Sequence, residues 1–144
     1  MTFSRPILLF FAATAFISTA ANAAQLTVLK SPYCGCCAKW IEHVQQHGFT
    51  VKVVETEDMA AVKQRLGVPE RLASCHTTMA GGYFIEGHVP AADIKRLLSQ
   101  KPKATGIAVP GMPGGSPGME TAAKEPYATI LVRPDGTTGV FARH

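Results

Sequence analysis

The sequence of 144 residues lacks several features that define large classes of protein. Beyond residue 23 it has no apolar run that approaches the roughly 20 residues a transmembrane helix needs. Its basic side chains are scattered and have no aromatic residues between them, so we expect no nucleic-acid partner. The formal net charge is only +4, and no segment indicates an obligate interface. We therefore expect a soluble monomer.

The N-terminus has the pattern of an export signal. Arg5 precedes an apolar run over residues 7–17, and the small residues Ala21-Asn22-Ala23 then fit a signal peptidase site. The apolar run is too short to span a bilayer as a helix. The sequence predicts that residues 1–23 are a cleaved signal peptide, that the protein is periplasmic, and that the mature chain has no membrane contact.

Strand and helix patterns alternate over the next part of the chain. Apolar residues recur with a period of two in the expected strands and at three- and four-residue spacing in the expected helices. The predicted elements are strands at 26–30, 50–55, 77–80 and 83–86 and helices at 38–47, 56–66 and 90–99. The order β-α-β-α-β-β-α predicts a thioredoxin-like α/β domain over residues 24–100.

The composition changes from residue 101 onward. Residues 108–120, here called the Met loop, are rich in glycine and proline, contain Met112 and Met119, and have no regular periodicity. Long loops of this kind inside a compact domain are usually functional or disordered. Strands expected at 128–132 and 138–141 flank a turn sequence. We expect residues 101–144 to be a C-terminal extension that packs on the same domain.

Three of the four cysteines lie within four residues, as Cys34, Cys36 and Cys37, and the fourth is Cys75. In an oxidising compartment two structural disulfides are one interpretation. A Cys36–Cys37 bridge would be strained, whereas Cys34–Cys37 is feasible and would leave Cys36 for Cys75. This would be an unusual use of three crowded thiols.

The spacing of Cys34 and Cys37 matches the C-x-x-C motif that follows the first strand of thioredoxin-like proteins. A helix N-terminus stabilises a thiolate there, which serves both disulfide exchange and metal binding. One hypothesis is therefore a thiol–disulfide oxidoreductase in which Cys34 attacks and Cys37 resolves. Cys36 has no evident role in that reaction.

A soft-metal site would use Cys36 as well. Thiolates select Cu(I), zinc or iron–sulfur clusters. Sulfurs that diverge at the start of a helix suit several bridged Cu(I) ions better than one tetrahedral ion. The preferred hypothesis is a copper–thiolate site of Cys34, Cys36, Cys37 and Cys75, which metal counting tests. Its alternative is a structural zinc site from Cys34, Cys37, Cys75 and His76.

Cys75 stands where thioredoxin-like folds normally place a proline against the C-x-x-C pair. We therefore expect its sulfur to face the other three, with His76 beside them. Met112 and Met119 offer thioethers, which are soft ligands, so the candidate metal ligands also include His76, Met112 and Met119. The roles of other residues are less defined: we expect His43 and His47 on a solvated helix side and His88 as a helix cap, and leave Met79 open.

Five motifs in order along the chain resemble the CopG-type family of bacterial copper-resistance proteins. They are Lys30-Ser31-Pro32-Tyr33-Cys34-Gly35-Cys36-Cys37, Gly67-Val68-Pro69, Ser74-Cys75-His76-Thr77, Glu86-Gly87-His88-Val89-Pro90-Ala91 and residues 109–120. The resemblance implies a periplasmic thioredoxin-like domain whose extension helps to bind metal, with copper at the Cys-x-Cys-Cys motif. It also implies interconversion of Cu(I) and Cu(II), as in a copper-dependent oxidoreductase, and contact with periplasmic copper export or handling proteins.

Overall fold

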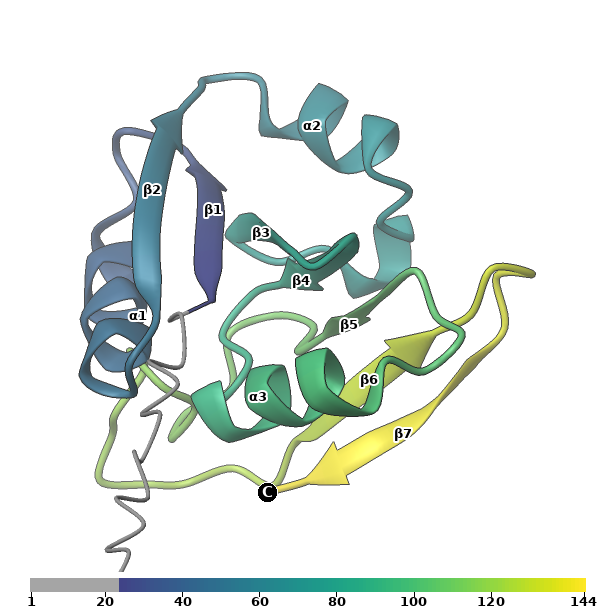
Figure 1. Ribbon diagram of the computed structural model, residues 1–144. Helices are drawn as coiled ribbons and strands as arrows, with labels where there is room; N and C mark the ends of the chain where they lie inside the picture. Colours follow the sequence, from purple (N-terminus) through teal and green to yellow (C-terminus); the bar gives the residue numbers. More distant parts are fainter. Residues whose placement is uncertain (1–23) are drawn as a thin grey trace, which may run out of the picture.

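The computed structural model describes residues 24–144, so the expected signal peptide lies outside the described residues (Figure 1). The elements, in chain order, are β1 (Gln25–Lys30), α1 (Gly35–Gln46), β2 (Thr50–Glu55), α2 (Met59–Arg65), a short 3-10 helix (Glu70–Leu72), β3 (His76–Ala80), β4 (Tyr83–Glu86), α3 (Ala91–Gln100), β5 (Gly106–Ala108), β6 (Ala128–Val132) and β7 (Thr138–Arg143). No helix of this described part is long and apolar enough to cross a bilayer.

All strands join one seven-stranded mixed sheet in the order β2-β1-β3-β4-β5-β6-β7. β1 is parallel to β2, the β3–β4 pair is an antiparallel hairpin, and β5 lies parallel to β4. The predicted β-α-β-α-β-β-α core is confirmed. The sequence prediction missed β5, because a strand of three residues that ends in a glycine- and proline-rich segment has no readable period.

Local sequence explains how the first half of the chain folds. Trp40 and Val44 lie four residues apart on α1 and are fully buried, which fixes the face that the helix turns to the sheet. Gly48 has a φ of +88° and reverses the chain from α1 into β2. Asp58 caps α2 by accepting a hydrogen bond from the Ala61 amide at 3.0 Å.

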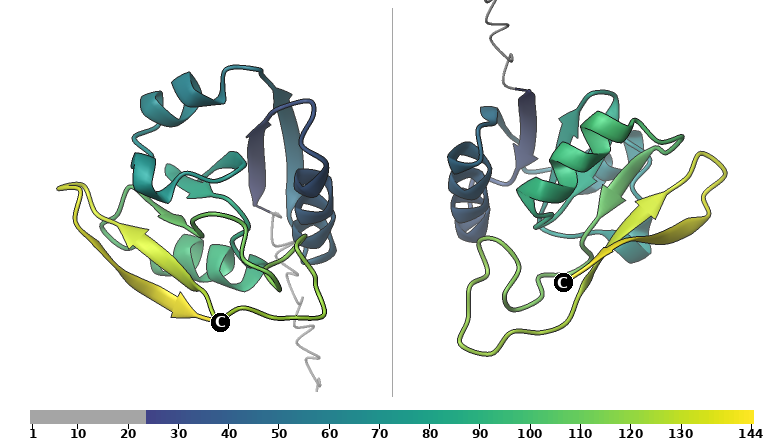
Figure 2. Two further views of the ribbon diagram at one scale, coloured as in Figure 1. Left: turned by 180° about the vertical axis from the view of Figure 1, so that it is seen from behind. Right: turned by 60° about the horizontal axis from the view of Figure 1, so that its bottom comes forward.

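The two faces of the sheet carry separate apolar clusters. α1 and α3 lie side by side on one face, where Trp40 and Ile94 pack with Val28 of β1 (Figure 2). The segment that follows α2 covers the other face, and its Leu72 belongs to a second apolar cluster that includes Phe84. The helices α1 and α3 therefore share one layer, and the start of α1 lies beside the end of β1.

The C-terminal extension continues the sheet. β5 pairs with β4, and β6 and β7 form the predicted hairpin, with β7 two residues longer than expected. Between β5 and β6 the Met loop leaves the sheet and runs back toward α1 (Figure 2). This return brings a segment far along the chain to the start of α1, where the cysteines lie.

Candidate metal centre

Three of the four cysteines lie at the N-terminus of α1. The helix begins at Gly35, three residues earlier than predicted, so Cys36 and Cys37 belong to its first turn. Cys34 and Cys37 form a disulfide, whereas Cys36 is free and half-buried. The pairing that the sequence allowed for Cys34 is therefore present, and the middle cysteine remains outside it.

Cys75 completes a cluster of four sulfurs. It lies immediately before β3, whose partner is β1, so it meets the end of β1 and the start of α1. The Cys36 Sγ is 3.6 Å from the Cys34 Sγ and 4.0 Å from the Cys75 Sγ. All four sulfurs lie within 4.8 Å of one another. The expectation that two distant stretches bring their cysteines together is confirmed.

Two buried imidazoles contact Cys75 from the other side. The His76 Nδ1 is 3.2 Å and the His88 Nε2 is 3.0 Å from the Cys75 Sγ. Both rings are fully buried. The position of His76 agrees with the expectation from sequence, but the expected role of His88 as a helix cap is wrong. Its side chain points at Cys75, and α3 has no side-chain cap at Pro90.

A hydrogen bond at Nδ1 fixes the tautomer of His88. Its Nδ1 is 2.7 Å from the carbonyl oxygen of Pro117, which can only accept, so Nδ1 must carry the proton and donate. A neutral ring then leaves a lone pair on Nε2, the atom that faces Cys75. Histidines that bind metals commonly have this arrangement, with the second nitrogen donating to a carbonyl.

Burial controls the protonation of the groups around Cys75. Desolvation, helped by Cys36, raises the pKa of the Cys75 thiol to about 12. Desolvation also lowers the pKa of His76 to about 3, and His88 and Lys63 act in the same direction. The His76 Nε2 is buried and has no hydrogen-bond partner within residues 24–144. In the metal-free state this part of the site is therefore neutral.

A buried ion pair holds the segment that carries Cys75. The Glu86 carboxylate is fully buried and lies 2.5 Å from the Lys63 Nζ. It also accepts hydrogen bonds from the Ser74 amide and the Thr77 hydroxyl, each at 2.6 Å. These donors lie on both sides of Cys75 and His76. Glu86 thereby fixes the backbone from which the fourth sulfur projects.

The Met loop covers the site. The Met112 Sδ is 3.9 Å from the Cys36 Sγ, and the Ser74 hydroxyl donates to the Gly111 carbonyl. Met119 lines a surface hollow together with Cys36. A Cβ on Gly118 would lie 2.8 Å from the Trp40 amide nitrogen, so only glycine allows the loop to approach α1 this closely.

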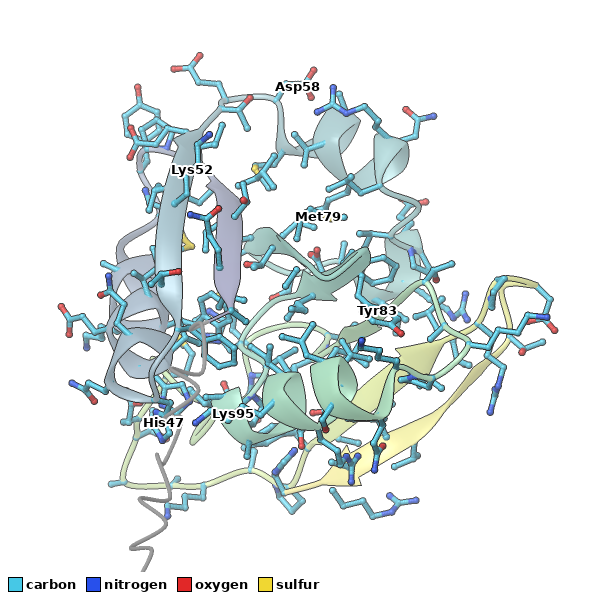
Figure 3. All side chains as sticks on the ribbon, viewed as in Figure 1. His47, Lys52, Asp58, Met79, Tyr83 and Lys95 are labelled. Carbon is cyan, nitrogen blue, oxygen red and sulfur yellow. A yellow bond between two sulfur atoms is a disulfide. The ribbon has the colours of Figure 1, made fainter. Side chains whose placement is uncertain are left out.

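The remaining histidines and Met79 lie outside the cluster. The His43 Nε2 accepts a hydrogen bond from the Ala91 amide at 3.1 Å, so this side chain caps α3 and is half-buried, which corrects the solvated position expected for it. His47 is exposed, as expected, at the end of α1 (Figure 3). Met79 packs against the apolar cluster around Phe84.

The donor set fits a soft metal ion. The two groups of side chains able to hold a metal in the described chain consist of cysteine and histidine alone and share Cys75. Thiolate, thioether and imidazole donors suit Cu(I) and zinc and are poor ligands for magnesium or calcium. The His76 Nδ1 and the His88 Nε2, each within 3.2 Å of the Cys75 Sγ, offer further donors beside the sulfurs.

Comparison with known proteins agrees with this geometry. Two solved structures, entitled "Copper resistance protein copG", forms 2 and 1, are each 44% identical to this chain. They match with TM-scores of 0.82 and 0.81, and the alignment covers 85% of this chain and 98% of theirs. The chain belongs to the CopG family. No curated protein sequence matches it significantly.

A family model described as "Protein of unknown function, DUF411" matches residues 72–119. This span holds Cys75, both buried histidines and residues 108–119 of the Met loop, and it excludes Cys34, Cys36 and Cys37. Sequence reasoning gave His88, Glu86 and Lys63 no part in the site. His88 and Glu86 both lie in a motif that carried the family resemblance, which was the available signal, whereas nothing marked Lys63.

Proposed function

We propose that this CopG-family chain is a periplasmic copper-binding protein of copper resistance. Copper is its cargo and is held as Cu(I) by the thiolates of Cys34, Cys36, Cys37 and Cys75. The observation that carries the proposal is the meeting of all four sulfurs within 4.8 Å, from two stretches of chain 38 residues or more apart.

The arrangement of the sulfurs supports a site for more than one ion. Three of them come from the first turn of one helix and the residue before it, and the fourth comes from the residue before β3. Cys36 is central, because its Sγ contacts the sulfurs of Cys34, Cys75 and Met112 at 3.6 to 4.0 Å. A bridging thiolate at this position would link neighbouring Cu(I) ions, and Met112 would complete the coordination on the exposed side.

The Cys34–Cys37 disulfide sets a condition on copper loading. Cys34 and Cys37 can supply thiolates only after a reductant, such as a thiol that is oxidised to its disulfide, has given two electrons to this bond. The site thus contains a group that accepts electrons. We propose that bound copper also changes its oxidation state, between Cu(I) and Cu(II). His88, with its Nε2 lone pair directed at Cys75, supplies a donor that suits either oxidation state.

Metal counting on the reduced protein tests the proposal. We expect purified protein, reduced and titrated with Cu(I) under anaerobic conditions, to bind more than one copper per chain and to prefer copper to zinc. Cys36→Ser should lower both the number of ions and the affinity. Saturation by one zinc ion, with no copper bound in competition, would contradict the proposal and favour a structural zinc site.

A second candidate function is thiol–disulfide exchange, which the Cys34–Cys37 disulfide specifically favours. In this reaction Cys34 attacks a substrate disulfide and Cys37 resolves the mixed disulfide. The same Cys36→Ser variant separates the two functions. An oxidoreductase should keep its exchange rate with a model disulfide, whereas a copper protein should lose metal.

A further inference from the structure

The two free thiols of the cluster face each other. Cys36 and Cys75 are both unpaired and half-buried, and their Sγ atoms are 4.0 Å apart. A disulfide requires about 2.0 Å between the sulfurs, so they must approach by about 2 Å, a distance that rotation about two Cα–Cβ bonds can supply. The adjoining sulfur of Cys34 is already bonded to Cys37.

We propose that Cys36 and Cys75 form a second redox-active dithiol pair, which exchanges with small disulfides and closes to a second disulfide beside Cys34–Cys37. The pair joins the first turn of α1 to the residue before β3. Each sulfur is held by its own element, one by the helix and the other by the Glu86 anchor at Ser74.

The reaction is balanced with a disulfide such as oxidised glutathione. The Cys36 sulfur attacks one glutathione sulfur, a Cys36–glutathione bond forms, the bond within oxidised glutathione breaks and one glutathione leaves. The Cys75 sulfur then attacks the Cys36 sulfur and expels the second glutathione. Cys36 and Cys75 are oxidised by two electrons, oxidised glutathione is reduced by two, and the two thiol protons end on the two glutathione molecules.

The second disulfide would control the copper site, and this consequence rests on the proposed function. With both bonds closed, none of the four cysteines can supply a thiolate, and the remaining soft donors are Met112 and the imidazoles. With one bond closed, Cys36 and Cys75 remain available. Each disulfide that forms removes two cysteine ligands, so the number of cysteine ligands falls in steps of two as the surroundings become more oxidising.

A pair of double variants tests the dithiol directly. The variant Cys34→Ser, Cys37→Ser keeps only Cys36 and Cys75, and its matched control, Cys34→Ser, Cys36→Ser, keeps Cys37 and Cys75. Each is purified, reduced, freed of metal with a chelator and treated with excess oxidised glutathione. Acid then stops the exchange, an alkylating reagent blocks free thiols, and mass spectrometry identifies the products.

We expect the first variant to lose two hydrogens and to carry neither glutathione nor alkyl groups, as a monomer. The control should form no disulfide, because full burial keeps glutathione from Cys37, and its Cys37 thiol should be alkylated once acid has unfolded the chain. Glutathione or alkyl groups on both cysteines of the first variant would overturn the inference. Cu(I) titration of the reduced wild type is run in parallel. A failure to bind copper there rejects the proposed function but does not affect the conclusion on the dithiol, which depends only on the products of the two variants.

Discussion

The two halves of the cysteine cluster differ in exposure. The sulfur half, made of Cys34, Cys36 and Met112, faces outward: both cysteines are half-buried, and Met112 is 50% exposed. The imidazole half, made of Cys75, His76 and His88, is anchored from within, and both of its histidine rings are completely buried. Cys36 and Cys75 join the halves at 4.0 Å.

This difference predicts different roles for the two halves in metal binding. The sulfur half offers polarizable donors where a metal ion or a small thiol can arrive from solvent. The imidazole half offers donors whose positions are fixed by the Glu86 ion pair and by the hydrogen bond of His88 to Pro117. Changes in the imidazole half should therefore affect the stability of the protein, whereas a change at Met112 should affect binding alone.

The largest effect is expected from Glu86→Ala. Removal of this carboxylate leaves the Lys63 ammonium largely buried without its partner and the Ser74 amide without an acceptor. Loss of one member of a buried ion pair typically costs about 3–5 kcal/mol. Urea unfolding of the metal-free protein should show a loss of that size.

The pair Lys30–Glu55 provides the control for this variant, because its carboxylate is exposed and the Lys30 Nζ keeps a hydrogen bond to the Ser31 carbonyl when Glu55 is removed. Glu55 is 55% exposed, so Glu55→Ala should lower the free energy of unfolding by less than about 1 kcal/mol. Similar losses for the two variants would show that the Glu86 anchor has no special importance and would remove the contrast between the halves.

Acid should destabilise the metal-free protein through His76. Its pKa is about 3 in the folded chain, against an ordinary value of 6.5. Between these two pH values the unfolded chain binds a proton at His76 and the folded chain does not. The contribution of His76 to the free energy of unfolding is fully present above pH 6.5. Below this pH it falls by about 1.4 kcal/mol per pH unit, which amounts to about 2 kcal/mol by pH 5. Urea unfolding at pH 7 and pH 5 measures this loss.

Substitution of His76 isolates its share of the pH dependence. His43 and His88 also have pKa values lowered by burial and add to the loss in the same direction. His76→Gln should therefore reduce the slope of the unfolding free energy against pH by about one proton without abolishing it. An identical slope in His76→Gln and wild type would contradict the assignment.

The smallest effect on stability is expected in the sulfur half. Met112→Leu replaces a thioether that is 3.9 Å from the Cys36 Sγ and half exposed. We expect Cu(I) affinity to fall about tenfold, the low end of the cost of a lost partner at a metal site. The free energy of unfolding should change by less than about 0.5 kcal/mol.

Met79→Leu is the control for the thioether, since Met79 packs in the apolar cluster around Phe84. It should leave Cu(I) affinity at the wild-type value. Equal affinities for Met112→Leu and wild type in a competition titration would place Met112 outside the copper site and leave the cysteines and histidines as its ligands.

Sequence reasoning reached the sulfur half because its signals are local. Three cysteines in four residues at a predicted helix start can be read directly, and the position of Cys75 follows from the order of strands. The core order of elements was predicted for the same reason, since its apolar periods are regular. The short strand β5 has no such period and was missed.

The contacts of His88 and Glu86 depend on tertiary structure that no local pattern reveals. His88 reaches Cys75 only because the turn after β4 passes beside the segment before β3, and its tautomer is set by Pro117 from the Met loop. The Glu86–Lys63 pair joins two elements 23 residues apart. Residues 24–100 and 101–144 remain predicted divisions, although β5 to β7 extend the same sheet.

A shared copper site requires Cys75 to bind the same metal as Cys34, Cys36 and Cys37. Anaerobic Cu(I) titration of reduced wild type and Cys75→Ser, with metal counted per chain, tests this directly. We expect the variant to bind fewer copper ions, each more weakly, although Cys34, Cys36 and Cys37 are intact. The same number of ions at the same affinity in both proteins would contradict a shared site.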